Sequence, residues 1–397
     1  MKTQLVGIAL FVATVSAVML YPAWKSNAGT LPVIASVDPM GNDRPKIEVV
    51  FVLDTTSSMS GFIQAAKEKI WSIATTMASA QPAPEMRIGL VAFRDRGDAY
   101  VTQVVDLSDD LDSVYAKLMD FKAVGGGDGP ESVNQALYDA VHRVSWSQGT
   151  DAYKVIFLVG DAPPHMDYPN EVQYPQTIKV ASANGIRINT IQSGKDNNTA
   201  RAWQRIASLN QGDFFNVAED GSAVAVVTPF DKNIAALSRE LDDTRLYFGS
   251  AADKAQQKLK REATEMMHAT ASTATRARRA AFNLTASGAR NFLGQQELVD
   301  AVVAGRIDLD DMDEAELPAA LQILAPEERK SVVMAQASRR HALQKKIKDL
   351  AGKRDDYIAH EIEAEGGAEE SLDNKLYSTL RRQAAAKGMV LEGGPKY

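Results

Sequence analysis

The sequence predicts an α/β fold, a doubly wound and mostly parallel sheet flanked by helices, followed by an α-helical C-terminal region. Two observations predict it. Up to about residue 248, short apolar runs alternate with segments of helical periodicity, as in parallel sheets that helices cover on both faces. Beyond about residue 250 the strand-like runs disappear, and apolar residues recur at spacings of three and four.

Four apolar runs are expected to form buried strands, at 47–53, 87–93, 154–160 and 186–192. The run 100–107 alternates between apolar and polar residues, which favours an antiparallel edge strand, and 214–219 is expected to be the last strand. Helical periodicity lies between them at 61–79, 131–145, 171–184 and 199–209. The predicted sheet domain therefore covers residues 46–248.

Residues 1–28 have the pattern of a targeting segment. Lys2 precedes an uncharged apolar run, and Ser26 and Ala28 place small residues at the −3 and −1 positions of a cleavage site. The stretch 5–24 is also about long enough to span a bilayer, so a cleaved signal peptide and a membrane anchor both stay open. Either one predicts an exported protein, periplasmic or anchored facing the periplasm. Residues 29–45, rich in Pro, Gly and Asp, are expected to be a linker.

The composition limits the classes of function. The 397 residues include no cysteine, which excludes disulfides, thiolate metal sites and cysteine nucleophiles. No strongly basic stretch interleaves with aromatic residues, so we expect no nucleic-acid partner. Residues 29–249 hold 28 acidic and 19 basic residues, whereas 250–397 holds 23 of each. An acidic sheet domain favours metal cations or basic partners.

The C-terminal region, 250–397, is expected to contain two long helices separated by an acidic connector at 306–318. The first has a narrow apolar stripe, which predicts a packing seam of the kind found in coiled coils: Ala255, Leu259, Ala263, Met266, Thr270, Ala274, Ala277 and Ala281. The second is expected at 327–363, with an apolar face formed by Leu343, Ile347, Leu350, Tyr357 and Ile358. We expect these helices to pack together or against the sheet domain, and residues 46–248 to fold without them.

Polar side chains follow the first strand at the point where it ends. Residues 47–53 are succeeded by Asp54-Thr55-Thr56-Ser57-Ser58. In open parallel sheets, ligands bind beyond the carboxyl ends of the strands. Asp54, Thr56 and Ser58 alternate along the loop, so their oxygens can converge on one point. Carboxylate and hydroxyl oxygens without nitrogen or sulfur suit a hard cation such as Mg²⁺.

Two further acids are expected at the same edge of the sheet. Asp128 stands in a glycine-rich turn, VGGGDGPES (124–132), which leads into a helix. Asp161 directly follows another buried strand. Two acids at strand ends, a loop of hydroxyls and a third acid on a glycine turn predict an octahedral oxygen site.

This arrangement resembles the von Willebrand factor type A domain and its metal-ion-dependent adhesion site. That family carries an Asp-x-Ser-x-Ser loop after its first strand, a distant Thr, and an Asp after a later strand. Asp54, Thr56 and Ser58 match the loop, with Thr in place of the first Ser, and Asp161 matches the later Asp. Asp128 stands where the family usually has Thr, which adds a negative charge. The resemblance covers residues 46–248.

The resemblance implies a Mg²⁺ site, with Mn²⁺ or Ca²⁺ as alternatives, whose open position takes an acidic group from a partner protein. Thr56, Ser58 and Asp128 would contact the metal directly. Asp54 and Asp161 would act through waters or as hydrogen-bond acceptors behind these ligands. The implied function is that of an exported, metal-dependent protein-binding module and not of an enzyme.

The same residues have simpler structural explanations and two alternative functions. Asp128-Gly-Pro-Glu131 has the spacing of a helix capping box, and Thr56 and Ser58 also fit a polar turn before a helix that starts near Ser60. One alternative function is a phosphoryl-transfer hydrolase with Asp54 as nucleophile, although such enzymes usually carry a second acid two residues on, where this chain has Thr56. The other is a membrane-anchored structural scaffold.

Other chemically suggestive residues are expected to be structural. Arg96-Gly97-Asp98 is predicted to be a turn, although Asp95 beside it is a candidate acid at the rim of the site. His165 and His268 lack partners at ligand spacing and are expected to be surface or packing residues. The acids of 308–313 depart from a calcium-loop pattern and are expected to form a solvated connector.

Overall fold

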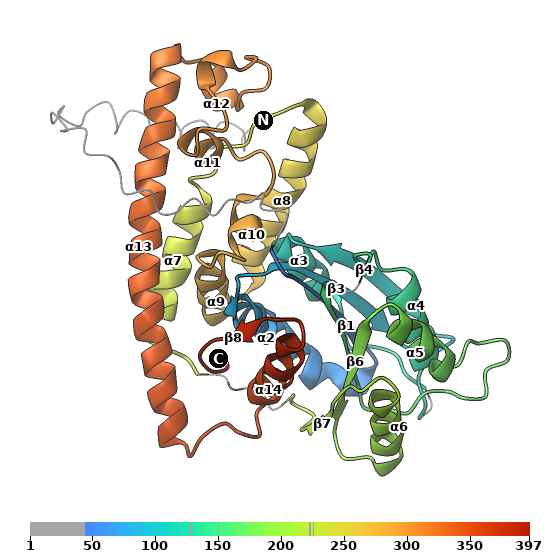
Figure 1. Ribbon diagram of the computed structural model, residues 1–397. Helices are drawn as coiled ribbons and strands as arrows, with labels where there is room; N and C mark the ends of the chain where they lie inside the picture. The colour runs from blue at the N-terminus through green and yellow to red at the C-terminus, as the bar shows by residue number, and fades with distance from the viewer. Residues whose placement is uncertain (1–43, 128, 150, 222–223, 225) are drawn as a thin grey trace. The chain divides into compact units, whose positions relative to one another are not determined.

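A sheet of six strands in the order β4-β3-β1-β5-β6-β7 organises the described residues of the computed structural model, and its strands are parallel except for β4 (Figure 1). The structure describes residues 44–397 apart from 128, 150, 222, 223 and 225. The strands are β1 (Lys46–Asp54), β3 (Glu85–Phe93), β4 (Thr102–Ser108), β5 (Tyr153–Gly160), β6 (Ile186–Ser193) and β7 (Phe214–Val217). All six expected strands are confirmed, including the antiparallel edge strand β4.

Helices connect the strands at the expected places. They are α2 (Ser60–Ala78), α3 (Leu111–Asp120), α4 (Val133–His142), α5 (Tyr174–Ala183) and α6 (Asn197–Ser208). Of these, only α3 lacks a counterpart in the sequence-based prediction. The predicted class, a mostly parallel sheet flanked by helices, is confirmed.

Both faces of the sheet are buried, which explains why β1 is apolar without interruption. Val49 and Phe51 pack among residues of α2, α3 and α14 (Leu372–Ala385). Val50 and Val52 point the other way and pack among residues of α4, α5 and α6. Because successive side chains of a strand alternate between faces, both sets must be apolar. Each side chain of this size contributes about 1.5–3 kcal/mol when fully buried.

The register places the carboxyl ends of the parallel strands at one edge of the sheet. Asp54, the last residue of β1, lies opposite Phe93, the last residue of β3. Its predecessor Leu53 lies opposite Val159 of β5. The loops that follow β1, β3 and β5 therefore leave the sheet beside one another, and this is where the predicted ligands stand.

The C-terminal helix α14 belongs to the core of the sheet domain. Leu372, Leu376 and Leu380 are buried in the same cluster as α2 and β1. Gln383 accepts a hydrogen bond from Tyr153 of β5 at 2.7 Å and bonds Asn189 of β6. After α14, β8 (Val390–Leu391) pairs antiparallel with β2 (Ala80–Gln81). The core of the sheet domain therefore does not end at residue 248.

The helix expected at 255–281 is instead two helices, α8 (Ala251–Thr270) and α9 (Thr273–Asn283). The chain is extended at Ala271 and Ser272, and the Ser272 hydroxyl caps α9 by accepting a hydrogen bond from the backbone N–H of Thr275. A serine that offers its oxygen to the backbone favours a helix start over a helix interior.

The apolar stripe expected along this segment is also wrong in most of its first half, although Ala263 is buried as expected. Leu259 and Met266 are exposed, whereas Lys260, Thr264 and His268 of α8 are buried. The polar face of α8 turns inward because it lies against α3 of the sheet domain. There Lys260 pairs with the half-buried Asp110 at the N-cap of α3, and Thr264 donates to the buried Asp112. Hydrophobic periodicity cannot detect a face that is buried through charges.

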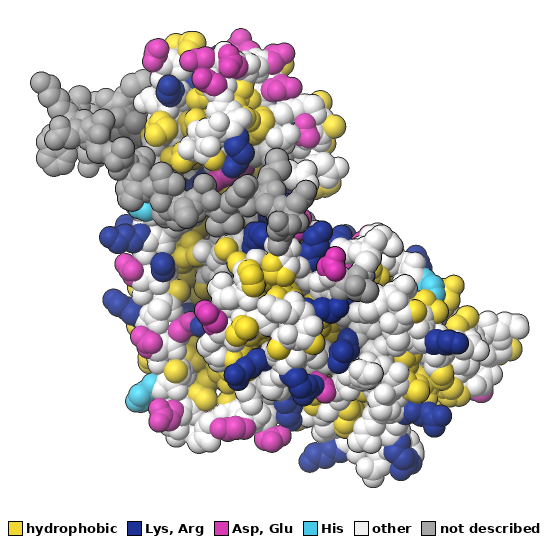
Figure 2. Space-filling view, viewed as in Figure 1, with side chains coloured by type: hydrophobic (Ala, Val, Ile, Leu, Met, Phe, Trp, Pro, Cys, Tyr) yellow, Lys and Arg dark blue, Asp and Glu magenta, His cyan; other side chains and the backbone are white. Residues whose placement is uncertain are grey.

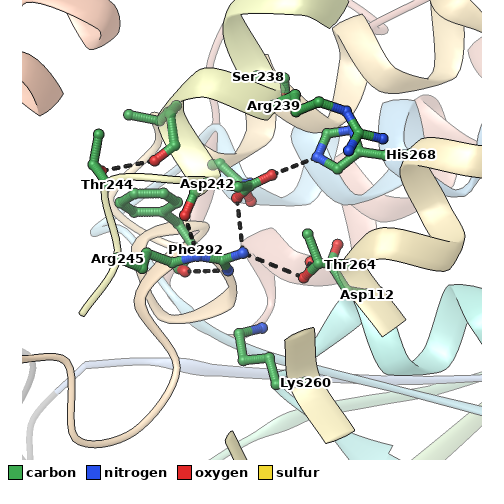
Figure 3. A network of polar contacts seen from close by, with 12 residues as sticks. Asp112, Ser238, Arg239, Asp242, Thr244, Arg245, Lys260, Thr264, His268 and Phe292 are labelled. Carbon is green, nitrogen blue, oxygen red and sulfur yellow. Dashed lines mark hydrogen bonds and ion pairs between the residues drawn. The ribbon is translucent and has the colours of Figure 1, made fainter. Parts of the chain in front are cut away.

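Arg279 of α9 is the centre of this buried network. Its Nε and Nη2 each donate to Asp112 of α3 at 2.6 Å, and its Nη1 donates to Asp242 at the end of α7 (Asp231–Asp242) at 2.7 Å. His268 Nε2 lies 2.7 Å from Asp242, and Thr264 Oγ1 donates to Asp112 (Figure 3). Charges removed from water are costly unless they are paired, and here each is paired across helices.

The second expected helix is confirmed as α13 (Pro326–Ala364), which packs against α7, α9 and α11 (Leu298–Val303). Within its expected face, Leu343, Ile347 and Ile358 are buried and Leu350 is half-buried, whereas Tyr357 is exposed. Two arginines of α13 are buried as well, and each pairs with an acid on another element. The pairs are Arg340 with Glu297, and Arg354 with Asp231.

The acidic connector contains the short η2 (Leu309–Asp311) and leads to α12 (Ala319–Gln322). Its aspartates at 308, 310, 311 and 313 are exposed, whereas Leu309 and Leu317 are buried. Figure 2 shows acidic side chains gathered over the end of the helical region that carries α12. A solvated acidic connector is what the sequence predicts here.

Residues 1–28 lie outside the described residues, so the choice between a signal peptide and a membrane anchor stays a prediction. Among the residues that the structure does describe, no helix combines the length and the apolar character needed to cross a membrane.

Candidate metal site

Asp54 stands at the carboxyl end of β1 with a side chain that is only 1% exposed. Its Oδ1 accepts the backbone N–H of Thr56 at 2.9 Å and the Thr56 hydroxyl at 2.6 Å. Its Oδ2 makes no hydrogen bond of normal geometry to any described residue. The backbone N–H of Asp161 lies close enough to the carboxyl to lower its pKa slightly, against the effect of burial. Burying a carboxylate oxygen without a partner is costly, so Oδ2 suits a cation.

The hydroxyls of the loop converge on Asp54 as expected. Thr56 Oγ1 lies 3.3 Å from Ser58 Oγ, and Thr56 is buried whereas Ser58 is exposed. Neither hydroxyl caps a helix, because η1 (Ser57–Met59) and α2 both begin without a side-chain cap. Thr56 and Ser58 therefore lie in the turn before α2, as that alternative expects, but neither hydroxyl acts as a helix cap.

The glycine-rich loop at 124–132 packs against the loop that follows β1. Ser57 donates to the carbonyl of Gly125 through its N–H and its hydroxyl, and Asp98 accepts the N–H of Gly126. Gly125 and Gly126 have φ of +88° and +82°, a conformation in which residues with a Cβ are strained. A Cβ on Gly126 would also stand 3.2 Å from Thr56 Cβ. The glycines allow the loop to approach the hydroxyls.

Asp128 lies outside the described residues, so its role as a ligand stays a prediction. The capping-box explanation of this segment is wrong, because α4 begins at Val133 with Ser132 as its N-cap residue and Glu131 precedes the helix. Asp161 follows β5 as expected and lies close enough to Asp54 for its charge to raise the pKa of that carboxyl.

Glu131 is a buried acid beside these loops that the sequence-based prediction did not include among the candidate ligands. Its backbone is held by the loop after β5: its N–H donates to Pro163 and its carbonyl accepts from the N–H of His165, both at 3.0 Å. The side chain is 4% exposed, and its Oε2 has no hydrogen-bond partner in the described part of the chain. The motif GGGDGPE contains this residue, but its spacing from Asp128 led to the capping-box interpretation.

Asp95 is a buried acid that ties two loops together behind the rim. Its Oδ1 accepts the Ser132 hydroxyl at 3.0 Å and the Tyr168 hydroxyl at 2.7 Å. His165 Nε2 lies 3.4 Å from Asp95 Oδ2, and the His165 ring stacks on Tyr168. These contacts fix the loop after β5 against the loop that enters α4. His165 is therefore a packing residue of the site.

Arg96-Gly97-Asp98 forms a turn, as expected. Its side chains take part in the contacts that hold the loops around the site together. The Arg96 guanidinium lies over the Tyr168 ring and pairs with Glu171 at 3.1 Å. Asp98 holds the glycine-rich loop through Gly126. Both charged ends of the tripeptide are thus engaged within the chain.

Negative charge accumulates at this edge of the sheet. Burial raises the pKa of Asp54 to about 7, against the opposing effect of its hydrogen bonds from Thr56. Burial also raises the pKa of Glu131 to about 9, and four carboxylates raise it further: Asp54, Asp95, Asp161 and Asp98. Carboxyls crowded in this way favour their neutral forms unless a cation compensates the charge.

The donors present fit a hard divalent cation. Two buried carboxylate oxygens, on Asp54 and Glu131, lack partners among the described residues, and two hydroxyls converge beside the first. No group of three or more Asp, Glu and His side chains arranged to hold a metal occurs among the described residues. A cation here would therefore depend on hydroxyl oxygens as well, which Mg²⁺ and Ca²⁺ accept.

Comparison with protein-family models places this site in a known domain. Residues 48–228 match the model described as von Willebrand factor A domain. The chain contains a von Willebrand factor A domain. The match includes all five predicted ligands and ends before α7, so the helical region lies beyond it. A comparison with curated proteins gives no significant match.

Solved structures that match part of this chain include one that is described as a VWA domain. The SpRpn10 VWA domain is 16% identical, with a TM-score of 0.34, and the match covers 44% of this chain and 89% of that one. The conserved hypothetical protein BatB from Bacteroides thetaiotaomicron is 14% identical, with a TM-score of 0.34, covering 55% and 99%. Proximal thread matrix protein 1 from the mussel byssus is 17% identical, with a TM-score of 0.35, covering 45% and 43%. At this similarity none of them indicates what this chain binds.

Proposed function

We propose that this chain is an exported, metal-dependent protein-binding module. The von Willebrand factor A domain would hold Mg²⁺, or Mn²⁺ or Ca²⁺, through Asp54, Thr56, Ser58, Asp128 and Asp161. The ion would supply an electrophilic position for an acidic group of a partner protein. Domains of this family are generally protein-interaction modules.

The observation that carries the proposal is the corner formed by Asp54, Thr56 and Ser58. One oxygen of Asp54 orients the Thr56 hydroxyl, while the other is buried and unpartnered among the described residues. Neither hydroxyl serves as a helix cap. A bound cation would account for an arrangement that orients these hydroxyls and leaves one buried carboxylate oxygen without a hydrogen bond of normal geometry among the described residues.

The same burial disfavours the hydrolase alternative. A nucleophilic aspartate must reach the phosphorus of its substrate, whereas Asp54 is 1% exposed and accepts two hydrogen bonds from Thr56. Ser58, by contrast, is exposed and can meet a partner. We therefore place binding at this site and assign no reaction to it.

The placement of the helical region is consistent with a binding role. Asp112 lies in the first turn of α3, which follows β4 at the end of the sheet opposite Asp54. The Arg279 network joins the helical region at that end. The loops around Asp54 are then left to a partner, while export and the apolar stretch 5–24 would bring the domain to the periplasm or the membrane surface.

Capture of partners tests this function. Full-length protein is used as bait in Mg²⁺ and again with a chelator, beside Ser58→Ala and the control Ser60→Ala, an exposed serine outside the proposed ligand set. We expect a partner that wild type and Ser60→Ala retain in Mg²⁺ and that the chelator and Ser58→Ala both release. Partners that all four conditions retain equally would contradict metal-dependent binding.

A further inference from the structure

We propose that Glu131 is an additional carboxylate of the cation site, beyond the five residues that the Asp-x-Thr-x-Ser pattern and its partners assign. This inference rests on the proposed function and extends it. The ligand concerned is a hard divalent cation. Glu131 would add a negative charge to the site from within the chain, directly or through a water.

The backbone around Glu131 is fixed in a way that positions its side chain. Its N–H and carbonyl are both engaged by the loop that follows Asp161, through Pro163 and His165. The isolated bridge between Glu131 and Pro164 joins the same two loops. Glu131 is therefore held between the loop after β5 and the glycine-rich loop, which are the two loops that carry Asp161 and Asp128.

The Glu131 side chain points toward the loop that carries the Thr56 and Ser58 hydroxyls. Its Oε1 is 3.6 Å from the point where a Cβ on Gly126 would stand, and Thr56 Cβ is 3.2 Å from that point. The charges that act most strongly on the Glu131 carboxyl belong to acids of the site, first Asp54 and then Asp95 and Asp161. Glu131 thus points into the space between the strand ends.

No structural role accounts for the Glu131 carboxyl. It precedes α4 and does not cap it, and no ion pair to Glu131 occurs among the described residues. The guanidinium of Arg94, which follows β3, is committed elsewhere, since it donates to the backbone carbonyls of Thr55 and Lys122. A carboxylate that is 96% buried, with an oxygen that no described residue satisfies, is explained by a cation that it faces.

An extra carboxylate changes what the site binds. Charge count is one of the ways in which proteins set their affinity for hard cations. With Glu131 the site holds a divalent ion tightly without a partner present, so metal binding and partner binding become separable steps. A partner's acidic group then competes with a carboxylate that the chain already supplies.

Calorimetric titration of the full chain with Mg²⁺ or Mn²⁺ alone tests this inference. The variants are Glu131→Gln and the control Glu48→Gln, a buried acid near the opposite end of β1 that pairs with Arg87. We expect Glu131→Gln to weaken metal binding by about 10- to 100-fold, the usual effect of removing a group that supports a metal. Glu48→Gln should bind the metal as wild type does.

Thermal melts in chelator separate a ligand from a structural residue. Glu131→Gln should melt at or above the wild-type temperature, because it removes a buried carboxyl without a partner, whereas Glu48→Gln should melt lower because it weakens an ion pair. Equal metal affinity of Glu131→Gln and wild type would overturn the inference, as would a loss of affinity accompanied by a lower melting temperature in chelator. If Glu131→Gln is insoluble, Glu131→Asp replaces it, and wild-type affinity in that variant would also overturn the inference. Failure of the wild type to bind metal would instead refute the proposed function.

Discussion

Arg279 of α9 and Asp112 of α3 lie 2.6 Å apart, and both side chains are completely inaccessible to solvent. Their sequence separation is 167 residues, so this contact joins the helical region to the sheet domain. A buried ion pair is not evidence of great stability in itself, because both charges are desolvated. We expect the pair to favour one way of fitting the two parts together, because another arrangement would leave these buried charges unpaired.

Replacing Arg279 with methionine should destabilise the protein by about 3–5 kcal/mol, because Asp112 and Asp242 would remain buried without their main cation. Chemical denaturation of the full chain measures this change. Arg239→Met is the matched control, since Arg239 pairs with Glu265 on the surface. Exposed pairs contribute about 0–1 kcal/mol, so a similar effect of both substitutions would contradict the role assigned to the network.

Low pH should weaken the ion pairs of Arg279 with Asp112 and Asp242, which join the helical region to the sheet domain. Burial alone would raise the pKa of Asp112, but the charge and hydrogen bonds of Arg279 outweigh it and hold the pKa at about 2. The pKa of Asp242 is lowered in the same way by Arg279 and Arg245. Since these acids bind fewer protons folded than unfolded, their contribution is present above about pH 4 and is lost as the pH falls toward 2. Thermal melts at successive pH values should show the melting temperature of wild type falling as the pH is lowered. The fall should be smaller in Arg279→Met.

Truncation of α14 side chains should destabilise the von Willebrand factor A domain although α14 lies outside the matched region. Leu376 is buried between α2 and the sheet. Leu376→Ala is expected to cost about 2–5 kcal/mol, the range for buried leucines. Leu259→Ala on the exposed face of α8 is the control and should change stability by about 0.5 kcal/mol or less. Denaturant melts that show equal effects would mean that α14 is peripheral.

The burial of α14 in the core also predicts how the fragment 29–249 should behave. The sequence pattern led us to expect that it folds and binds metal, because every proposed ligand lies within it. The structure leads to the opposite expectation, since without α14 the apolar residues of α2 and β1 that face Leu372, Leu376 and Leu380 become exposed. We expect the fragment to aggregate or to lack a cooperative melt. A soluble fragment with a sharp thermal transition would show that the sheet domain tolerates this loss.

Much of the sheet and the loop after β1 could be predicted from the sequence, because both depend on local patterns. A strand buried on both faces is uniformly apolar, and ligands at strand ends follow from parallel topology. Lys260 and Thr264 could not be placed, because their burial depends on acids about 150 residues away in the sequence. His268 could not be placed either, because its partner Asp242 lies on another helix, 26 residues earlier. Glu131 was missed for a related reason: its local spacing fits a helix cap, and only the distant loop at 163–165 reveals its position.

Metal binding itself should stabilise the domain. A ligand that binds only the folded state, at about 100 times its dissociation constant, adds about 2.7 kcal/mol. Thermal melts of wild type in chelator and in millimolar Mg²⁺ should therefore differ.

Asp54→Asn tests whether Asp54 is responsible for this difference. The variant keeps the shape of the side chain and resembles its protonated form, which burial already favours, so its melt in chelator should stay near that of wild type. Its melt in Mg²⁺ should coincide with its melt in chelator, because the buried anionic oxygen that faces the site is gone. Glu48→Gln should keep the metal-dependent shift. A wild-type melt that does not respond to Mg²⁺, Mn²⁺ or Ca²⁺ would count against a cation site at the end of β1.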